Sequence, residues 1–394
     1  MQARRLQHVS PFRVVELLER AKALEETGVK VVHLEVGEPD FPTAAPIVAA
    51  GHRALEAGAT KYTQALGIPA LRRRIARYYQ ESAGIVVAPE RVVVTAGASA
   101  GLMLLSALLL DPDDELLLPD PGYPCNEVFV RLVNAVPVHV AVLPEEGFRL
   151  DAGKVAAQWS TATRGLLVAS PANPTGAVLD AATLKSLAEL VRARHGFLLL
   201  DEIYQGLTYE DITGQGPGYR SGLAVDDGIY VLNSFSKYFG MTGWRLGWMV
   251  VPEPAVDAVA RLAQNLFISP PSLSQHAALA AFEPDAMAVH ESRRAAFGRR
   301  LTRLCDGLES LGFSIPARPG GAFYVYADIS HTGLGAEEFC WRLLEEHHVA
   351  ATPGIDFGAH DAGRFVRFAF TTGEDDIVLG LERLGRALRD WGVA

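Results

Sequence analysis

The sequence predicts an α/β protein in which a large domain, with a mostly parallel seven-stranded sheet between helices, is joined to a smaller α+β domain. The chain has 394 residues, 49% hydrophobic and 21% charged, which is long enough for two domains and a large core. From about residue 91, short continuous apolar runs alternate with helical stretches, as is typical of parallel strands covered on both faces. The final part of the chain mixes strands with helices, which indicates the smaller domain.

The first part of the chain is expected to form a short arm and a helix within residues 1–30. The helix is indicated by apolar residues that recur at helical spacing: Val14, Leu17, Leu18, Ala21 and Leu24. A short strand over 31–36 leads into a loop rich in turn residues over 37–42. Helices are predicted over 46–57 and from about Ala70.

The large sheet is expected to contain seven apolar strands, over 92–94, 116–118, 138–142, 166–169, 197–200, 229–232 and 246–251. A long helix over 286–311 carries one apolar stripe along its length. It is followed by predicted strands over 322–327 and 365–370 and by predicted helices over 337–346 and 375–388. We therefore expect three parts: 1–45, an N-terminal arm with part of the small domain; 46–285, the large domain; and 286–394, the small C-terminal domain.

Charge and cysteine content predict a soluble, cytoplasmic protein. The net charge of -10 argues against a nucleic-acid partner and against an anionic membrane surface. No apolar block near the N-terminus resembles a signal peptide, and the longest apolar run, 102–110, is interrupted by Ser106 and too short to span a bilayer. The three cysteines, Cys125, Cys305 and Cys340, have neither disulfide-framework nor zinc spacing, which fits a reducing compartment.

The most informative stretch is 229–248, where an apolar run leads to Lys237 and then to Arg245. Burial lowers the pKa of a lysine, and the neutral amine is a nucleophile that forms Schiff bases. Ser234, Ser236 and Arg245 are good donors for a phosphate. A Schiff-base lysine beside a phosphate cradle is what pyridoxal phosphate (PLP) requires. Taken alone, the stretch also fits a polar loop with a solvated lysine and arginine.

Other polar residues follow further predicted strands, where ligands of open α/β sheets bind. Small residues over 95–101 open a helix and suit a phosphate, although they also suit tight packing. Tyr123 lies on a Pro-rich turn where its ring could stack on a flat cofactor, and Asn173 lies between prolines that restrict its backbone. A surface or core tyrosine and an ordinary Asn-Pro turn remain the alternatives.

Asp201 ends a predicted buried strand, and a buried carboxylate needs a partner. A protonated pyridine nitrogen would provide one, and that ion pair maintains the electron sink of PLP chemistry. A metal ligand or helix cap is the alternative. No histidine or second acidic cluster with metal-ligand spacing accompanies Asp201, so we predict no metal site.

Together these stretches resemble the class I/II aminotransferases, PLP enzymes with the PLP-transferase fold of type I. The resemblance runs from 34–40 to 364–368. Its motifs stand in the family's order: Thr95-Ala-Gly-Ala-Ser99, Asp120-Pro-Gly-Tyr-Pro124, Asn173-Pro-Thr-Gly176, Asp201-Glu-Ile-Tyr204, Ser234-Phe-Ser-Lys237 and Gly243-Trp-Arg-Leu-Gly247.

The resemblance implies a role for each catalytic position. Lys237 is similar to the family's Schiff-base lysine, which also moves the proton at the substrate's α-carbon. Asp201 is similar to the partner of the pyridine nitrogen. Asn173 and Tyr204 are similar to the donors to the cofactor's phenolic oxygen.

The resemblance also implies the binding residues. The phosphate cup corresponds to Ala98, Ser99, Ser234 and Arg245, with Tyr123 under the cofactor ring and Tyr62 reaching the phosphate of a neighbouring subunit. Arg367 is similar to the arginine that holds the substrate α-carboxylate, helped by Gly37 and Asn173, and its planar fork suits a carboxylate. A homodimer acting on an amino acid and a 2-oxo acid is implied.

The sequence departs from the family at Asn126, where another aromatic residue is common, and at Ser99, where dicarboxylate-specific members often carry lysine. We therefore expect a neutral, medium-sized apolar or aromatic amino acid, with glutamate and 2-oxoglutarate as the usual other couple. Four apolar residues are expected to border the pocket: Phe12, Phe41, Phe267 and Ile268.

Four alternatives remain open: a carbon–sulfur β-lyase on the same fold, an aspartate-type aminotransferase with an arginine from the partner subunit, a PLP-binding regulator, and a cofactor-free structural protein.

Overall fold

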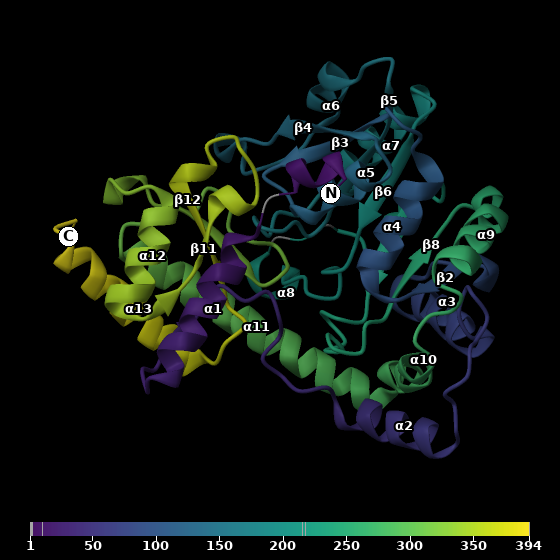
Figure 1. Ribbon diagram of the computed structural model, residues 1–394, viewed down its shortest axis with the longest axis horizontal. Coiled ribbons are helices and arrows are strands. Elements are labelled where there is room, and N and C mark those ends of the chain that lie inside the picture. The colour runs from purple at the N-terminus through teal and green to yellow at the C-terminus, as the bar shows by residue number, and fades with distance from the viewer. Residues whose placement is uncertain (1–2, 10, 215, 217, 394) are drawn as a thin grey trace.

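The computed structural model describes residues 3–9, 11–214, 216 and 218–393 and is built around a seven-stranded sheet (Figure 1). The strand order is β2-β8-β7-β6-β5-β3-β4. Every neighbouring pair is parallel except the two that contain β8, which is antiparallel to β2 and β7. The strands are β2 (Val92–Thr95), β3 (Glu115–Asp120), β4 (Val136–Ala141), β5 (Thr163–Ala169), β6 (Phe197–Asp201), β7 (Tyr230–Ser234) and β8 (Gly247–Val250). The predicted mostly parallel sheet is confirmed.

Helices cover both faces of this sheet. Successive residues of a strand point to opposite faces, so each face carries apolar side chains that a layer of helices must bury. In β2, Val92 and Val94 face one hydrophobic cluster and Val93 faces the other. The helices in this part of the chain are α2 (Ala45–Glu56), α3 (Pro69–Ala83), α4 (Gly97–Leu109), α5 (Cys125–Leu132), α6 (Ala152–Gln158), α7 (Ala181–Ala193), α8 (Glu210–Thr213), α9 (Val256–Leu266) and α10 (Ser272–Leu279).

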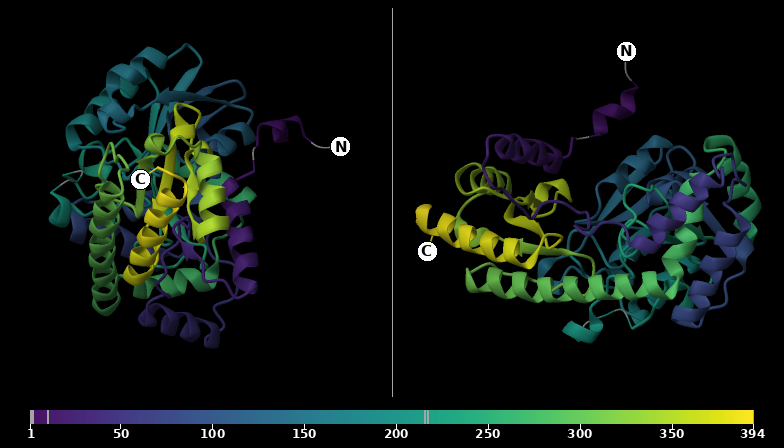
Figure 2. Two further views of the ribbon diagram at one scale, coloured as in Figure 1. Left: turned by 90° about the vertical axis from the view of Figure 1, so that its left-hand side faces the viewer. Right: turned by 90° about the horizontal axis from the view of Figure 1, so that it is seen from below.

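A second, three-stranded antiparallel sheet has the order β11-β12-β9. Its strands are β9 (Tyr324–Asp328), β11 (Thr352–Pro353) and β12 (Phe365–Ala369), and α12 (Ala336–His347) and α13 (Glu374–Asp390) lie beside it. The long helix α11 (Pro284–Ser310) runs from α10 to this second sheet, as Figure 2 shows from below. The predicted helix over 286–311 is therefore confirmed, while the domain boundaries stay a prediction.

The N-terminal part lies against the second sheet through α1 (Arg13–Glu26). The strand predicted over 31–36 was too long: β1 is only Val32–His33 and pairs in parallel with β10 (Val349–Ala350). The N–H of Leu34 still donates to the carbonyl of Ala350 at 2.9 Å, but its own carbonyl accepts from the backbone N–H of Ala369 at 2.6 Å, so the parallel pair ends at this residue. The chain beyond it turns toward the large sheet.

Short 3-10 helices connect these elements, at Arg4–His8, Pro89–Arg91, Pro144–Glu146, Gly222–Ala224, Glu253–Ala255, Ala280–Phe282, Ser330–Thr332, Gly354–Asp356 and Ala362–Arg364. Among the described residues, no helix has the length and apolar character needed to cross a membrane.

Candidate active site

A cavity of about 590 Å³ lies where the carboxyl ends of the large sheet's strands meet α1 and the second sheet. The structure brings together in its lining most of the residues that the sequence singled out: Gly37, Ala98, Ser99, Tyr123, Asn173, Asp201, Tyr204, Ser234, Lys237, Arg245 and Arg367. Tyr62 does not line the cavity formed by the described part of the chain and is 81% exposed. Its predicted contact with a neighbouring subunit stays a prediction.

Lys237 lies in the loop that joins β7 to its antiparallel neighbour β8. Its Nζ donates a hydrogen bond to the backbone oxygen of Gly37 at 2.7 Å and lies 5.5 Å from the ring centre of Tyr204. Burial lowers the pKa of Lys237 to about 8, and the positive charge of Arg367 acts in the same direction. A lysine with this pKa is partly neutral near pH 7 and can act as a nucleophile or a base.

Asp201 ends β6 and is buried. Burial raises the pKa of its carboxyl group to about 6, although the backbone N–H of Ile203 at 3.1 Å and the charge of Lys237 favour the ionised form. A carboxylate in this position would be stabilised by a cationic ring nitrogen placed against it.

An anion cradle lies at the start of α4. Gly97 has a φ of +78°, and a Cβ at this position would lie 2.8 Å from Nη2 of Arg245. The positive φ favours glycine, and the absence of a Cβ lets the guanidinium approach the first turn of the helix, whose N–H groups also favour anions. Ser99 and Ser234 add hydroxyl groups to the same cavity wall. This donor set fits a phosphate group.

Arg367 lies on β12, across the cavity from the large sheet. Its Nη1 donates to Oδ1 of Asn173 at 3.0 Å, and its Nη2 donates to the backbone oxygen of Glu35 at 2.7 Å. The guanidinium lies between the rings of Tyr324, at 4.2 Å, and Phe357, at 4.6 Å. Its Nε is buried and has no hydrogen-bond partner among the described residues, and Nη1, which carries two N–H groups, makes one hydrogen bond among them.

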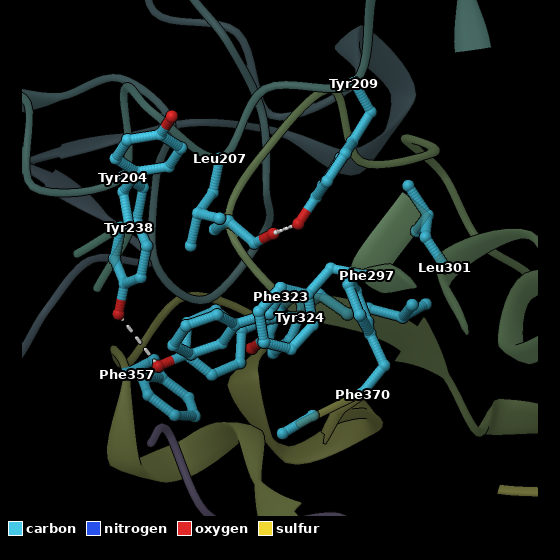
Figure 3. Packing of buried hydrophobic residues seen from close by; sticks show 14 of the residues in the cluster. Tyr204, Leu207, Tyr209, Tyr238, Phe297, Leu301, Phe323, Tyr324, Phe357 and Phe370 are labelled. Atoms are coloured by element: carbon cyan, nitrogen blue, oxygen red, sulfur yellow. Dashed lines mark hydrogen bonds between the residues drawn. The ribbon is translucent and has the colours of Figure 1, made fainter. Parts of the chain in front are cut away.

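Tyr324 is a site residue that the sequence analysis missed. Its hydroxyl lies 2.9 Å from that of Tyr204, and Figure 3 shows the two groups pointing toward each other. It also explains Gly37, since a Cβ there would lie 2.3 Å from the Tyr324 hydroxyl. The only available signal was the aromatic alternation of Tyr324 and Tyr326 in a predicted strand, which is equally typical of a core strand.

Asp356 was missed as well. Its carboxylate accepts the backbone N–H of Arg13 at 3.1 Å and of Val14 at 2.9 Å, and so caps the start of α1. The cap positions Phe12 and the first turn of α1 in the cavity wall. No local pattern links residues so far apart in the sequence.

The expected pocket residues are only partly confirmed. Phe12 lines the cavity, but the prediction was wrong for Phe41, whose ring packs against Phe297 at 5.5 Å and under the guanidinium of Arg300 at 4.9 Å. Phe267 and Ile268 lie outside the lining formed by the described residues and are 37% and 55% exposed. They follow α9 on the surface instead.

A nucleophilic lysine, a buried carboxylate, an anion cradle and a carboxylate-binding arginine around one cavity define a PLP enzyme of fold type I. The residues present fit that cofactor, because Arg245 lies against the start of α4 in an anion cradle and the buried carboxylate of Asp201 would be stabilised by a cationic ring nitrogen. The chain belongs to the aminotransferase class I and II family, whose model matches residues 29–384.

Curated relatives agree with this family. The chain is 38% identical to a valine–pyruvate aminotransferase of Mycobacterium tuberculosis, with 96% of each chain covered. It is 37% identical to an aspartate/prephenate aminotransferase of Thermus thermophilus, with 98% of each covered.

Solved structures agree too. An aminotransferase from Mycobacterium tuberculosis matches with a TM-score of 0.94 at 38% identity, covering 99% of each chain. Aspartate aminotransferase from Thermus thermophilus with maleate has a TM-score of 0.91 at 36% identity, covering 98% of this chain and 100% of that one.

Proposed function

We propose that this protein transfers an amino group between a neutral, apolar or aromatic amino acid and a 2-oxo acid, using PLP in a ping-pong mechanism. The observation that carries the proposal is the placement of Lys237 and Arg367 in one cavity, with Asn173 bound to the arginine. An amino acid held by its carboxylate at Arg367 would present its α-carbon to the lysine amine. When bound, PLP supplies an aldehyde that carries the amino group and a ring that takes up the electron pair released at the α-carbon.

Each residue has one task in this proposal. Asp201 would keep the ring nitrogen of the cofactor protonated, Tyr123 would stack on the ring, and the cradle of Ala98, Ser99, Ser234 and Arg245 would hold the phosphate. Because Oδ1 of Asn173 accepts from Arg367, its amide nitrogen is left to donate to the phenolic oxygen, beside the Tyr204 hydroxyl.

Lys237 performs the proton transfer. Because its pKa is lowered to about 8, the amine can take a proton from the α-carbon near neutral pH as a base and give the proton back later in the reaction as an acid. The Gly37 carbonyl, which accepts the Nζ hydrogen bond, orients the amine toward the cavity. Arg367, which lines the cavity, would hold the α-carboxylate with its guanidinium group.

The lining of the cavity supports a neutral side chain. Its outer wall is apolar and includes Phe12, Val14, Val15, Leu18, Val36, Leu102 and Phe357. The cationic side chains in the lining are Lys237, Arg245 and Arg367, and each already has a task. A wall of this kind discriminates weakly, at about 1–3 kcal/mol per methylene, so several related amino acids should react.

The test is an assay of the purified, PLP-loaded protein with one 2-oxo acid and the common amino acids. We expect matched amounts of new amino acid and new 2-oxo acid, with the parallel double-reciprocal lines of ping-pong kinetics. Release of pyruvate and ammonia without an acceptor would instead identify a carbon–sulfur β-lyase. A preference for aspartate over alanine, leucine, methionine and phenylalanine would identify an aspartate-type enzyme.

We further propose a cytoplasmic homodimer. The exposed side chains of Tyr62, Phe267 and Ile268 support it, since large exposed apolar groups mark contact surfaces. Sedimentation of the wild-type protein and of Tyr62→Ala tests this: a monomer that transaminates at the full rate would refute it.

A further inference from the structure

Two buried tyrosine hydroxyl groups share one hydrogen bond in the wall of the active-site cavity. Tyr204 follows β6 and Tyr324 begins β9, and their hydroxyl oxygens lie 2.9 Å apart (Figure 3). Neither hydroxyl has a second hydrogen-bond partner among the residues that the structure describes. Each hydroxyl carries one proton, and the shared bond uses only one of the two. One O–H group therefore remains to donate to a group bound in the cavity.

The residues around Tyr324 hold its hydroxyl in one position. The guanidinium of Arg367 lies 4.2 Å from the centre of the Tyr324 ring, and the ring of Phe323 packs edge-on at 4.9 Å. The hydroxyl lies against Gly37, where any side chain would collide with it. A ring fixed in this way keeps its hydroxyl within hydrogen-bond distance of Tyr204, and a buried O–H group without an acceptor costs free energy.

The direction of the shared bond decides which proton is left for the cavity. If Tyr204 donated to Tyr324, the remaining proton would lie on Tyr324, beside Arg367. If Tyr324 donates, the remaining proton lies on Tyr204. In the proposed function Tyr204 donates to the phenolic oxygen of PLP, and a hydroxyl cannot donate its single proton twice. Tyr324 must then be the donor of the shared bond.

Resting on the proposed aminotransferase function, we propose that Tyr324 is a positioning residue for the cofactor, which donates to the Tyr204 hydroxyl and so directs the Tyr204 proton at the phenolic oxygen of PLP. A hydroxyl that accepts a hydrogen bond also donates a stronger one. Tyr324 belongs to the second sheet and Tyr204 follows a strand of the large sheet. The second sheet thereby influences the protonation of a cofactor that is held mainly by residues of the large one.

The experiment is a pH titration of the absorbance of PLP bound to the holoenzyme, whose midpoint reports the loss of a proton from the bound cofactor. A donor to the phenolic oxygen favours the form that has lost the proton, so its removal raises the midpoint. Tyr204→Phe should raise the midpoint by about 1–2 pH units, the effect of one hydrogen bond to a charged group. Tyr324→Phe should raise it by about 0.3 unit, because an accepted hydrogen bond strengthens the donated one by roughly 10–30%. The double variant should match Tyr204→Phe alone, since Tyr324 acts through Tyr204.

Tyr326→Phe is the matched control. It also removes a buried tyrosine hydroxyl from β9, two residues further along, but Tyr326 does not line the cavity in the described structure. Its midpoint should equal that of the wild type. Tyr324→Phe keeps the ring that packs under Arg367, and circular dichroism of each variant confirms that the fold is retained.

Three results would overturn the inference. A lower midpoint in Tyr324→Phe would show that Tyr324 competes with the cofactor for the Tyr204 proton. An unchanged midpoint, with weaker binding of carboxylate inhibitors, would place the Tyr324 hydroxyl at the substrate. A Tyr324→Phe shift that persists in the Tyr204→Phe background would show that it acts without Tyr204. If the wild-type protein transaminates, each of these results refutes this inference alone, whereas a PLP-loaded wild type that does not transaminate refutes the proposed function.

Discussion

Arg367→Lys is the substitution with the most direct consequence for substrate binding. The guanidinium donates to Asn173 and to the backbone of Glu35 and is stacked between two aromatic rings. Lysine keeps the positive charge but has a single nitrogen and no planar fork. It cannot hold the protein acceptors, which include Thr352 at 3.3 Å, and a substrate carboxylate at once, so the substrate contact is the one that weakens.

The expected loss is about 1.5–3 kcal/mol, the value of a hydrogen bond to a charged group. At about 1.4 kcal/mol per tenfold change, kcat/KM should fall by roughly 10- to 150-fold. The fall should be similar for the amino acid, the 2-oxo acid and carboxylate inhibitors, because all share the α-carboxylate. The absorbance spectrum of bound PLP should not change, since Arg367 stands apart from the cradle.

Steady-state kinetics of both half-reactions and inhibitor titrations measure this. Arg364→Lys, the same change at a half-exposed position that does not line the described cavity, is the matched control and should leave kcat/KM unaltered. A loss confined to one substrate class would show that Arg367 contacts the side chain. A changed PLP spectrum would show that Arg367 acts on the cofactor, directly or through Asn173.

Four further outcomes are expected. Lys237→Ala should abolish transamination while circular dichroism shows a folded protein; activity near that of the wild type would refute the assignment. Because burial lowers the pKa of Lys237 to about 8, the rate at which the apo-protein recombines with PLP should rise steeply between pH 7 and 9, as the neutral fraction grows from about a tenth to about nine-tenths. Asp201→Asn should slow α-proton removal in single turnovers far more than it weakens PLP binding, and the reverse pattern would mean that Asp201 only positions the ring. Glu35 raises the pKa of His33 from 6.5 to about 9, so their ion pair should stabilise the fold fully below pH 6.5 and not above pH 9. The difference in urea midpoint between the wild type and His33→Gln should therefore shrink between these pH values. A constant difference would contradict the ion pair.

The residues that sequence patterns located are those at strand ends of one sheet. Asn173 and Lys237 follow β5 and β7, and Asp201 ends β6 between them; the carboxyl ends of parallel strands lie at one edge of the sheet. A short apolar run followed by a polar residue is therefore enough to place each of them. The direction of β8 was not predictable in this way, because an apolar run is the same for a parallel and an antiparallel strand.

The residues that were missed or misplaced depend on packing between distant segments. Tyr324 and Asp356 come from the second sheet and the loop beside it, and only the assembled fold brings them to Gly37 and α1. Phe41 is apolar like a pocket residue, but it is only partly buried and packs against the core beneath the guanidinium of Arg300. Tertiary contacts of this kind leave no periodic trace in the sequence.

The cap that Asp356 provides for α1 fixes the order in which the pocket is completed during synthesis. The acceptor follows Val14 by 342 positions, so α1 leaves the ribosome long before the carboxylate that starts it. Phe12 offers no side-chain cap of its own, and a free helix of 14 residues is marginal in water. Helix α1 is therefore anchored by a residue that emerges 342 positions later, and a nascent chain that already holds the cradle and Lys237 still lacks the anchored α1 that forms one wall of the cavity.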